Sequence, residues 1–215
     1  MNSASPSRRL PGRPAPLRIA GIPLGAARVL LFLLGLVPLA RWIWLGMTDS
    51  LGANPVEFLT RSSGTWAFIC LLVTLANTPL RVLLRQPLLI RLRRMSGLFA
   101  FFYACLHVMT YVWWDQWFML DSIVADVIER PFIALGVLAF LTLIPLAVTS
   151  TQGWMRRLGP RWRALHRLVY LTGLFAILHL WLHKAGKNDL QDVFLFGGVL
   201  AVLLGWRIWR RFRLL

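Results

Sequence analysis

Six apolar blocks recur along this 215-residue chain, at residues 26–47, 66–84, 97–119, 131–149, 164–183 and 193–209. Each block is long enough to cross a bilayer, since a spanning helix needs about 20 apolar residues. Hydrophobic residues make up 58% of the chain, more than the roughly half that a soluble domain contains. The sequence therefore predicts an all-α membrane protein, a polytopic bundle of six transmembrane helices, and no internal repeat stands out among the blocks.

The predicted membrane domain occupies nearly the whole chain. Residues 1–20 are rich in Pro, Ser and Arg and predict a flexible cytosolic tail. Residues 21–211 form the predicted transmembrane domain, and residues 212–215 form a short cytosolic end. The apolar run 26–47 is too long for the core of a signal peptide and is not closed by a small-residue cleavage site, so we expect it to be the first span.

Charged residues separate into two groups along the chain. Arginine clusters occupy the N-terminal tail, the link between the second and third blocks, the link between the fourth and fifth blocks, and the C-terminus. The remaining links hold every acid, namely Asp49, Glu57, Asp115, Asp121, Asp126, Glu129, Asp189 and Asp192. By the positive-inside rule, both termini are expected to be cytoplasmic. The net charge of +16 is therefore attributed to topology, and no element that would read a nucleic acid is visible.

Histidines are concentrated inside the apolar blocks. His107 lies midway through block 97–119, and His179 lies deep in block 164–183. Ionisable residues within spans are costly and point to function. Counted from the arginine-rich side, His107 is about 10 residues deep and His179 about 15, so the two could flank one planar cofactor. Two neutral imidazoles on an iron porphyrin make a six-coordinate b-type haem, which suits electron transfer. His183 is expected to anchor the outer interface.

His166 is more ambiguous. It precedes His179 by 13 residues, about 19.5 Å along a helix axis, which would suit a second haem stacked across the membrane. On an ideal helix, however, 13 steps turn by about 220°, so the two side chains would not share a face. The neighbouring end of block 97–119 offers only Arg93 and Arg94. His166 is thus either a haem ligand or a solvated interfacial residue, and Arg93 and Arg94 could pair with haem propionates or a flavin phosphate.

Three long stretches carry a resemblance to a known family. They are LGANPVEFLTRSSGTWA, RQPLLIRLRRMSGLFAFFYACLHVMTY and AVTSTQGWMRRLGPRWRALHRLVYL. These stretches resemble the MsrQ (YedZ) family, the membrane haem subunit of the bacterial periplasmic methionine-sulfoxide reductase system, within the wider ferric-reductase-like transmembrane group. The likeness covers nearly the whole chain after residue 25, and the histidines of the family match His107, His166 and His179.

The resemblance implies an electron-transfer subunit of an oxidoreductase complex in the bacterial inner membrane, not the catalytic subunit. Electrons are expected from the quinol pool or a cytosolic flavin reductase. They are expected to cross on haem b and to reach a periplasmic molybdenum-cofactor methionine-sulfoxide reductase that repairs oxidised proteins. Related oxidases carry four haem-ligating histidines and this chain matches three, so one or two haems are expected. FMN is a further implied cofactor, and membrane lipid the remaining expected partner.

Two other functions stay open on the sequence alone. The first is a stand-alone membrane ferric or quinone reductase, against which the lack of a G-x-G-x-x-G or Walker motif in the sequence counts. The second is a haem-free membrane scaffold whose histidines only pack between helices. A reducible haem spectrum in the purified protein would separate the scaffold from the other two.

Overall fold

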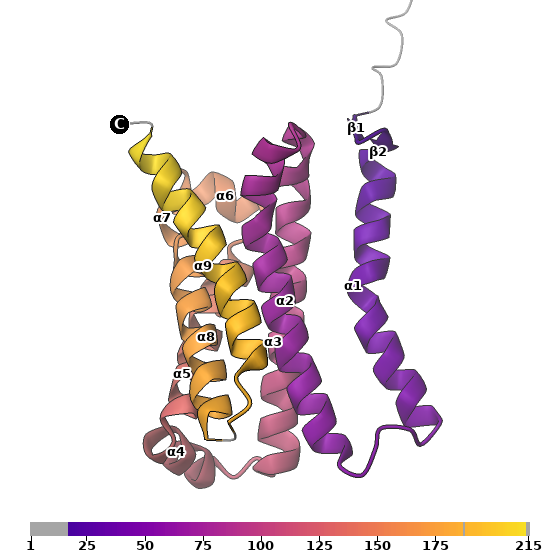
Figure 1. Cartoon of the computed structure of the whole chain (residues 1–215), viewed down its shortest axis with the longest axis vertical. Helices are drawn as coiled ribbons and strands as arrows, with labels where there is room; N and C mark the ends of the chain where they lie inside the picture. The colour runs from indigo at the N-terminus through magenta and orange to yellow at the C-terminus, as the bar shows by residue number, and fades with distance from the viewer. Residues whose placement is uncertain (1–16, 187, 214–215) are drawn as a thin grey trace, which may run out of the picture.

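Six helical segments of this computed structural model, which describes residues 17–186 and 188–213, are long and apolar enough to span a bilayer. They are α1 (Leu24–Met47), α2 (Pro55–Leu83), the run Pro87–Asp115 that contains α3 (Arg93–Thr110), α5 (Pro131–Val148), the run Pro160–Ala185 that ends in α8 (Leu168–Ala185), and α9 (Gln191–Phe212). They run roughly alongside one another (Figure 1). The predicted all-α bundle of six transmembrane helices is confirmed.

Helix α2 begins eleven residues before the predicted second span. The prediction started at residue 66, where the apolar residues become continuous. In the structure, Pro55 stands in the first turn, where its missing N–H is not needed. The side chain of Asn54 accepts a hydrogen bond of 3.1 Å from the backbone N–H of Glu57 and so caps the helix. This cap starts the helix in a polar segment. The first turns of α2 are therefore polar and precede the apolar part that was predicted to span the membrane.

Several short elements were not predicted. The third span passes from a 3₁₀ turn (Pro87–Leu92) into α3 and then into a π-helical turn (Tyr111–Asp115), and α4 (Leu120–Glu129) follows in the link. The predicted fifth span is interrupted, because α7 (Pro160–Leu165) ends two residues before α8 begins, and α6 (Gln152–Leu158) precedes it. Two short strands, β1 (Arg18–Ile19) and β2 (Ile22–Pro23), pair antiparallel. The predicted tail up to residue 16, and residues 214–215, lie outside the described residues.

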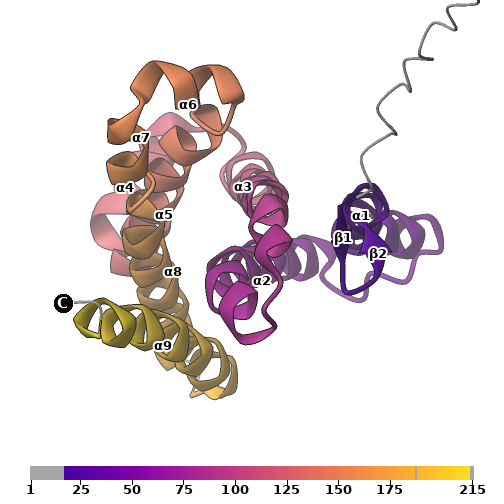
Figure 2. The ribbon, with the colours of Figure 1, turned by 90° about the horizontal axis from the view of Figure 1, so that it is seen from above.

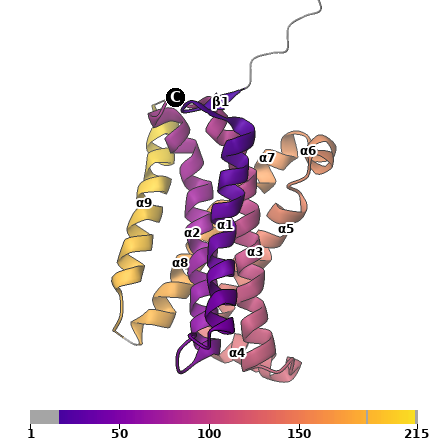
Figure 3. The same cartoon turned by 90° about the vertical axis from the view of Figure 1, so that its right-hand side faces the viewer.

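The two ends of the bundle carry opposite charge. One end, the basic end, holds β1, β2, α6, α7 and the end of α9, and the other, the acidic end, holds α4 and the links α1–α2 and α8–α9 (Figures 1 and 3). Within the described residues, arginines gather in the elements of the basic end and in the link between α2 and α3, whose 3₁₀ turn contacts β1, and the eight acids lie in or beside the elements of the acidic end. The separation of charge along the sequence is therefore a separation in space.

Two helix pairs form the centre of the fold. Helix α2 packs most extensively on α3, and α5 on α8, while α9 contacts both α2 and α8. A core cluster joins five of the spanning helices through Phe68, Leu71, Leu72, Leu75, Ala100, Leu146, Val169 and Leu200. Helix α1 stands at the margin (Figure 2). Its contacts with the bundle include Trp42, which packs edge-on against Tyr103 at 5.5 Å and donates a hydrogen bond to Ser62. They also include a hydrogen bond from the Tyr103 hydroxyl to the carbonyl of Gly35.

Arg207 of α9 completes the backbone hydrogen bonding of α2. Pro79 lies inside α2 and has no N–H to donate to the carbonyl of Leu75, four residues earlier. Arg207 donates to that carbonyl through Nη2, and its guanidinium group lies 5.4 Å from the ring centroid of Tyr170 in α8. An unpaired carbonyl is costly in apolar surroundings. Arg207, which the sequence suggested only as a topology signal, therefore also joins α9 to α2 and α8.

Candidate haem site

His107 of α3 and His179 of α8 lie next to each other inside the bundle. Their ring centroids are 6.1 Å apart, and the ring planes are inclined by 75°. Both side chains keep partial accessibility although they point between the helices. The structure thus brings together the two histidines that were predicted from their depth to meet.

Each imidazole is held by a backbone carbonyl of a neighbouring helix. His107 Nδ1 lies 2.8 Å from the Thr60 oxygen in α2, and His179 Nδ1 lies 2.6 Å from the Phe132 oxygen in α5. A carbonyl can only accept, so each Nδ1 carries the proton and each Nε2 is left as the basic nitrogen. Histidines that bind metals are usually oriented in this way, through the nitrogen that does not touch the metal.

The residues present fit an iron porphyrin. A metal–imidazole bond is about 2 Å, so two rings on one ion have centroids about 6 Å apart, which matches the observed spacing. Among the described residues, no group of three or more His, Cys, Asp or Glu could hold a bare ion, whereas a porphyrin supplies four ligands itself. Thr60, whose carbonyl holds His107, also has a buried hydroxyl that lacks a hydrogen-bond partner among the described residues. A bound cofactor is one way to satisfy such a group.

The two half-sites are built alike. In each, a helix supplies the carbonyl acceptor, a glycine follows one turn later, and the histidine follows 47 residues after the acceptor. The second set follows the first by 72 positions throughout: Thr60 and Phe132, Gly64 and Gly136, His107 and His179. This internal repeat escaped prediction because the apolar residues around it are not alike. The equal separation of each glycine from its histidine was the signal that could have found it.

His183 lies closer to this site than predicted. Its ring is 6.5 Å from that of His179, nearly parallel to it, and 5.6 Å from that of Phe132. The sequence predicted an interface anchor at this position, one helical turn beyond His179. In the structure, His183 borders the paired histidines on the side of the acidic end.

His166 lies apart from the pair, at the basic end where α7 meets α8. Its ring stacks on Trp162 at a centroid distance of 3.9 Å, and its Nδ1 lies 3.2 Å from the Trp162 carbonyl oxygen. Because the helix is interrupted here, the ideal-helix angle between His166 and His179 does not apply. All four histidines are among the described residues, and the other three are at the first site. His166 therefore has no second imidazole opposite it.

Of the two arginines predicted near His166, the structure brings one to it. Arg93 is half-buried and lies close enough for its charge to act on both His166 and Arg207, whereas Arg94 is exposed. The geometry of α3 explains the difference. Arg93 precedes His107 by 14 residues, close to four full turns, so the two share a helix face.

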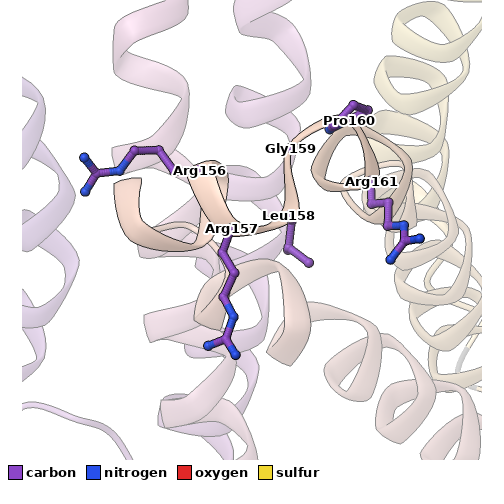
Figure 4. A pocket seen from close by; sticks show the side chains of 6 residues that line it. All are labelled: Arg156, Arg157, Leu158, Gly159, Pro160 and Arg161. Carbon is purple, nitrogen blue, oxygen red and sulfur yellow. The ribbon is translucent and has the colours of Figure 1, made fainter.

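A hollow of about 390 Å³ lies at the junction of α6 and α7, lined by Arg156, Arg157, Leu158, Gly159, Pro160 and Arg161. Gly159 makes the sharp turn there with a positive φ of 51°. In Figure 4, the side chains of Arg156, Arg157 and Arg161 point in different directions. Because these groups do not converge, they do not fit a single flavin phosphate.

Known proteins resemble the chain over most of its length. Residues 63–177 match a family model described as "Ferric reductase like transmembrane component". A Bordetella pertussis protein named "Protein-methionine-sulfoxide reductase heme-binding subunit MsrQ" is 62% identical over 92% of this chain and 96% of its own length. Proteins of the same name from Ralstonia nicotianae (52% identical, 86% of each chain) and Xanthomonas euvesicatoria (46% identical, 86% of this chain and 87% of the relative) are also similar. No solved structure matches the chain significantly.

Proposed function

This chain belongs to the MsrQ family of ferric-reductase-like membrane subunits, and we propose that it passes electrons across the bacterial inner membrane to a periplasmic methionine-sulfoxide reductase that holds a molybdenum cofactor. Its six spans make it a multi-pass protein of that membrane. The observation that carries the proposal is the pair of inward-facing imidazoles at 6.1 Å, each with Nδ1 on a backbone carbonyl.

His107 and His179 are the residues that we propose would hold the iron of a b-type haem. The Thr60 and Phe132 carbonyls hold the two Nδ1–H groups and leave both Nε2 lone pairs for iron. When bound, b-type haem supplies a one-electron oxidation and reduction step. Because two protein imidazoles would hold the iron, the site would suit electron transfer and not chemistry on a substrate.

A second haem is proposed at the basic end, with His166 as its protein ligand. Arg93 is the arginine that we propose to pair with a propionate there, since it is half-buried and its charge acts on His166. We assign no such role to Arg94, which is exposed on another face of α3. In this proposal, one haem is held by the pair His107 and His179, and the second haem has His166 as its one histidine ligand.

The direction of transfer is proposed from charge. The basic end faces the cytoplasm by the positive-inside rule, and the acidic end faces the periplasm and the partner reductase. Reporter fusions after Arg94 and Arg163 should then read cytoplasmic, and fusions after Asp121 and Asp189 periplasmic. The donor is proposed to be the quinol pool or a cytosolic flavin reductase. A flavin reductase with an acidic docking face would complement the arginines of the basic end.

FMN is proposed only because the family resemblance implies it. The arginines of the hollow between α6 and α7 point apart (Figure 4) and do not fit its phosphate. We therefore assign no residue to FMN and no step to it.

The test of the proposed function is the spectrum of the purified protein and its exchange of electrons with the partner. Protein expressed with ample haem should be red, with Soret and α bands that change on reduction, and the reduced form should be reoxidised by the partner reductase plus oxidised methionine. A colourless protein would contradict the proposal and favour a scaffold. Rapid turnover of ferric ion or quinone without the partner would favour a stand-alone reductase.

A further inference from the structure

Gly64 of α2 and Gly136 of α5 each lie directly against one ring of the imidazole pair. A Cβ atom at position 64 would lie 3.0 Å from His107 Cε1 and 3.1 Å from its Nδ1. At position 136 it would lie 2.9 Å from His179 Nδ1 and 3.0 Å from its Cε1. Ordinary van der Waals contacts of a Cβ are 3.4–4 Å. An alanine at either position would therefore force the ring to move.

A ring that gives way to a Cβ atom would move away from its carbonyl and weaken its hydrogen bond. The carbonyl that holds each Nδ1 belongs to the same helix as the glycine, one turn earlier: Thr60 for Gly64 and Phe132 for Gly136. The carbonyl draws the ring onto the helix, and the glycine leaves room for the ring there. Both glycines lie in helix interiors, where glycine is a poorer helix former than alanine. A packing reason is therefore needed for them, and the imidazole supplies it.

Other glycines show that this contact is not general. A Cβ at Gly198 or Gly205 of α9 would meet nothing within 4 Å. Gly35 of α1 is tightly packed, with a Cβ only 2.5 Å from the Phe99 ring, but its neighbour is not a histidine. The chain thus offers one control without contacts and one control with a clash away from the site.

We propose that Gly64 and Gly136 are positioning residues that set the orientation of His107 and His179 and keep the two ring planes close to perpendicular, at the 75° of this structure. This inference rests on the proposed function, in which His107 and His179 hold haem. It adds the statement that the helices facing the ligands, α2 and α5, determine the ligand geometry. It also predicts that the two glycines act equivalently, since they are related by the internal repeat.

The orientation of the ligands has a spectroscopic signature. In low-spin ferric haem, two imidazole planes that are nearly perpendicular give a highly anisotropic EPR signal with one large g value, and parallel planes give a less anisotropic one. A ring pushed off its carbonyl also becomes a weaker donor to iron, which raises the midpoint potential. The g values and the midpoint potential both report on the two imidazoles. A loss of overall protein stability does not change them in the same way.

The experiment compares Gly64→Ala and Gly136→Ala with Gly198→Ala and Gly35→Ala in the full-length protein. We expect a smaller largest g value, a higher midpoint potential and weaker haem retention in the first two variants. Gly198→Ala should match the unaltered protein, and Gly35→Ala should lower thermal stability while keeping the EPR signal. Because the first two variants are equivalent, either one that folds is sufficient for the test.

The two proposals can fail separately. If His107→Ala and His179→Ala lose haem but both glycine variants keep the original EPR signal and potential, the positioning role is wrong and the proposed function stands. If Gly35→Ala changes the signal as much as the other two, the signal reports general destabilisation and the positioning role is also wrong. If the unaltered protein binds no haem, the proposed function itself is wrong.

Discussion

The helix pairs α2–α3 and α5–α8 are alike toward the acidic end and different toward the basic end. Toward the acidic end, each pair provides a carbonyl acceptor, a glycine and a histidine in the same relative places. At the basic end, α3 continues as a regular helix down to Arg93, whereas the other pair is interrupted between α7 and α8 and places His166 at the interruption. The same scaffold therefore carries a symmetric pair of imidazoles and, about four helical turns away, a single one.

This difference bears on how firmly each place can hold a cofactor. The paired imidazoles are each fixed by a hydrogen bond and by helix packing, so they are already arranged for a ligand. His166 is fixed by stacking on Trp162, and the residue that approaches it from α3 is a cation. We therefore expect the two places to differ in affinity and potential, with the symmetric site the tighter one.

The largest effect should come from the symmetric site. His107→Ala and His179→Ala should each remove most of the haem bound there, because either change takes one of two protein bonds from iron. The double variant should be little worse than either single one, since the residues act as a unit. The measurement is the ratio of haem to protein after purification, and Cys105→Ala is the control that should keep the full ratio.

Unequal losses of haem in His107→Ala and His179→Ala would show that the two half-sites are not equivalent. His183 lies one turn from His179, so it is a nearby imidazole that could replace it. Combining His179→Ala with His183→Ala removes that route, and the combined loss should equal that of His107→Ala. Full haem content with an unchanged low-spin spectrum in both single variants would show that this pair is not the axial pair.

A smaller effect is expected at the basic end. His166→Ala should lower the ratio of haem to protein by a distinct fraction and leave the EPR signal of the symmetric site intact. The same variant should not change the hydrogen bonds from His107 and His179 to their backbone carbonyls. His166 is held by the ring and the carbonyl of Trp162, and neither of these interactions involves α2 or Phe132. An unchanged ratio would mean that His166 is an interfacial residue and that the chain holds a single haem.

A third effect tests the hydrogen bond that Arg207 of α9 donates to the Leu75 carbonyl, which Pro79 in the first helix pair leaves open. Arg207→Met should lower the free energy of unfolding by about 1 kcal/mol, since it leaves a partly buried carbonyl unpaired. In a Pro79→Ala background, residue 79 can donate to Leu75, so the same change should cost less. Unfolding titrations in mixed micelles measure the four proteins of this cycle.

The control for that cycle is Arg210→Met. Arg210 stacks on Trp206 at 5.2 Å, much as Arg207 stacks on Tyr170, but its bond partners do not include the Leu75 carbonyl. Equal costs of Arg207→Met with and without Pro79 would show that the stacking, and not the open carbonyl, accounts for the effect of Arg207.

The smallest effect concerns the link between α8 and α9. Lys184 donates to the Asp189 carboxylate and lies 3.2 Å from that of Asp192, and its hydrogen bond holds the pKa of Asp189 below the ordinary value. A carboxylate with a lowered pKa contributes stability at neutral pH, and this stability is lost as the pH falls through the folded pKa. The Asp189 carboxylate is exposed, so the contribution is small.

Asp189→Asn should therefore lower the thermal midpoint slightly at pH 7 and have less effect as the pH approaches 3. Haem content should not change, because the link lies outside both helix pairs. Asp49→Asn, at the same end of the molecule, is the control. A midpoint difference that grows toward acid pH would contradict the assignment of the pair.

The sequence predicted the parts of the fold that depend on apolar length and charge. The six spans follow from blocks that match the bilayer, and the two charged ends follow from the segregation of arginines and acids. Elements that depend on local caps and breaks were missed. Asn54 and Pro55 start α2 in a polar stretch, and the turn at His166 lies within a block that is apolar enough to look continuous.

Prediction of the candidate site was limited in a similar way. Depth alone indicated that His107 and His179 could meet, because a helix converts residue number into distance. The carbonyls that orient the rings could not be foreseen, since backbone acceptors have no residue type, and Gly64 and Gly136 are not distinctive among 16 glycines. Arg93, and not Arg94, lies on the same helix face as His107. This could be worked out only once α3 was known to begin at Arg93, so that the helical phase could be counted from there.

The hydrogen bond between Arg207 and Leu75 also bears on biosynthesis. Leu75 belongs to α2 and Arg207 to α9, so this donor is made only after the ribosome has added the residues up to Arg207, 132 positions later. Until then, a chain already in the membrane carries an open carbonyl in its second span, a mark by which quality-control proteases could distinguish chains without α9 from chains that contain it. A chain ending at residue 206 should accordingly be degraded faster in a pulse–chase experiment than the full chain, and Pro79→Ala should slow that degradation.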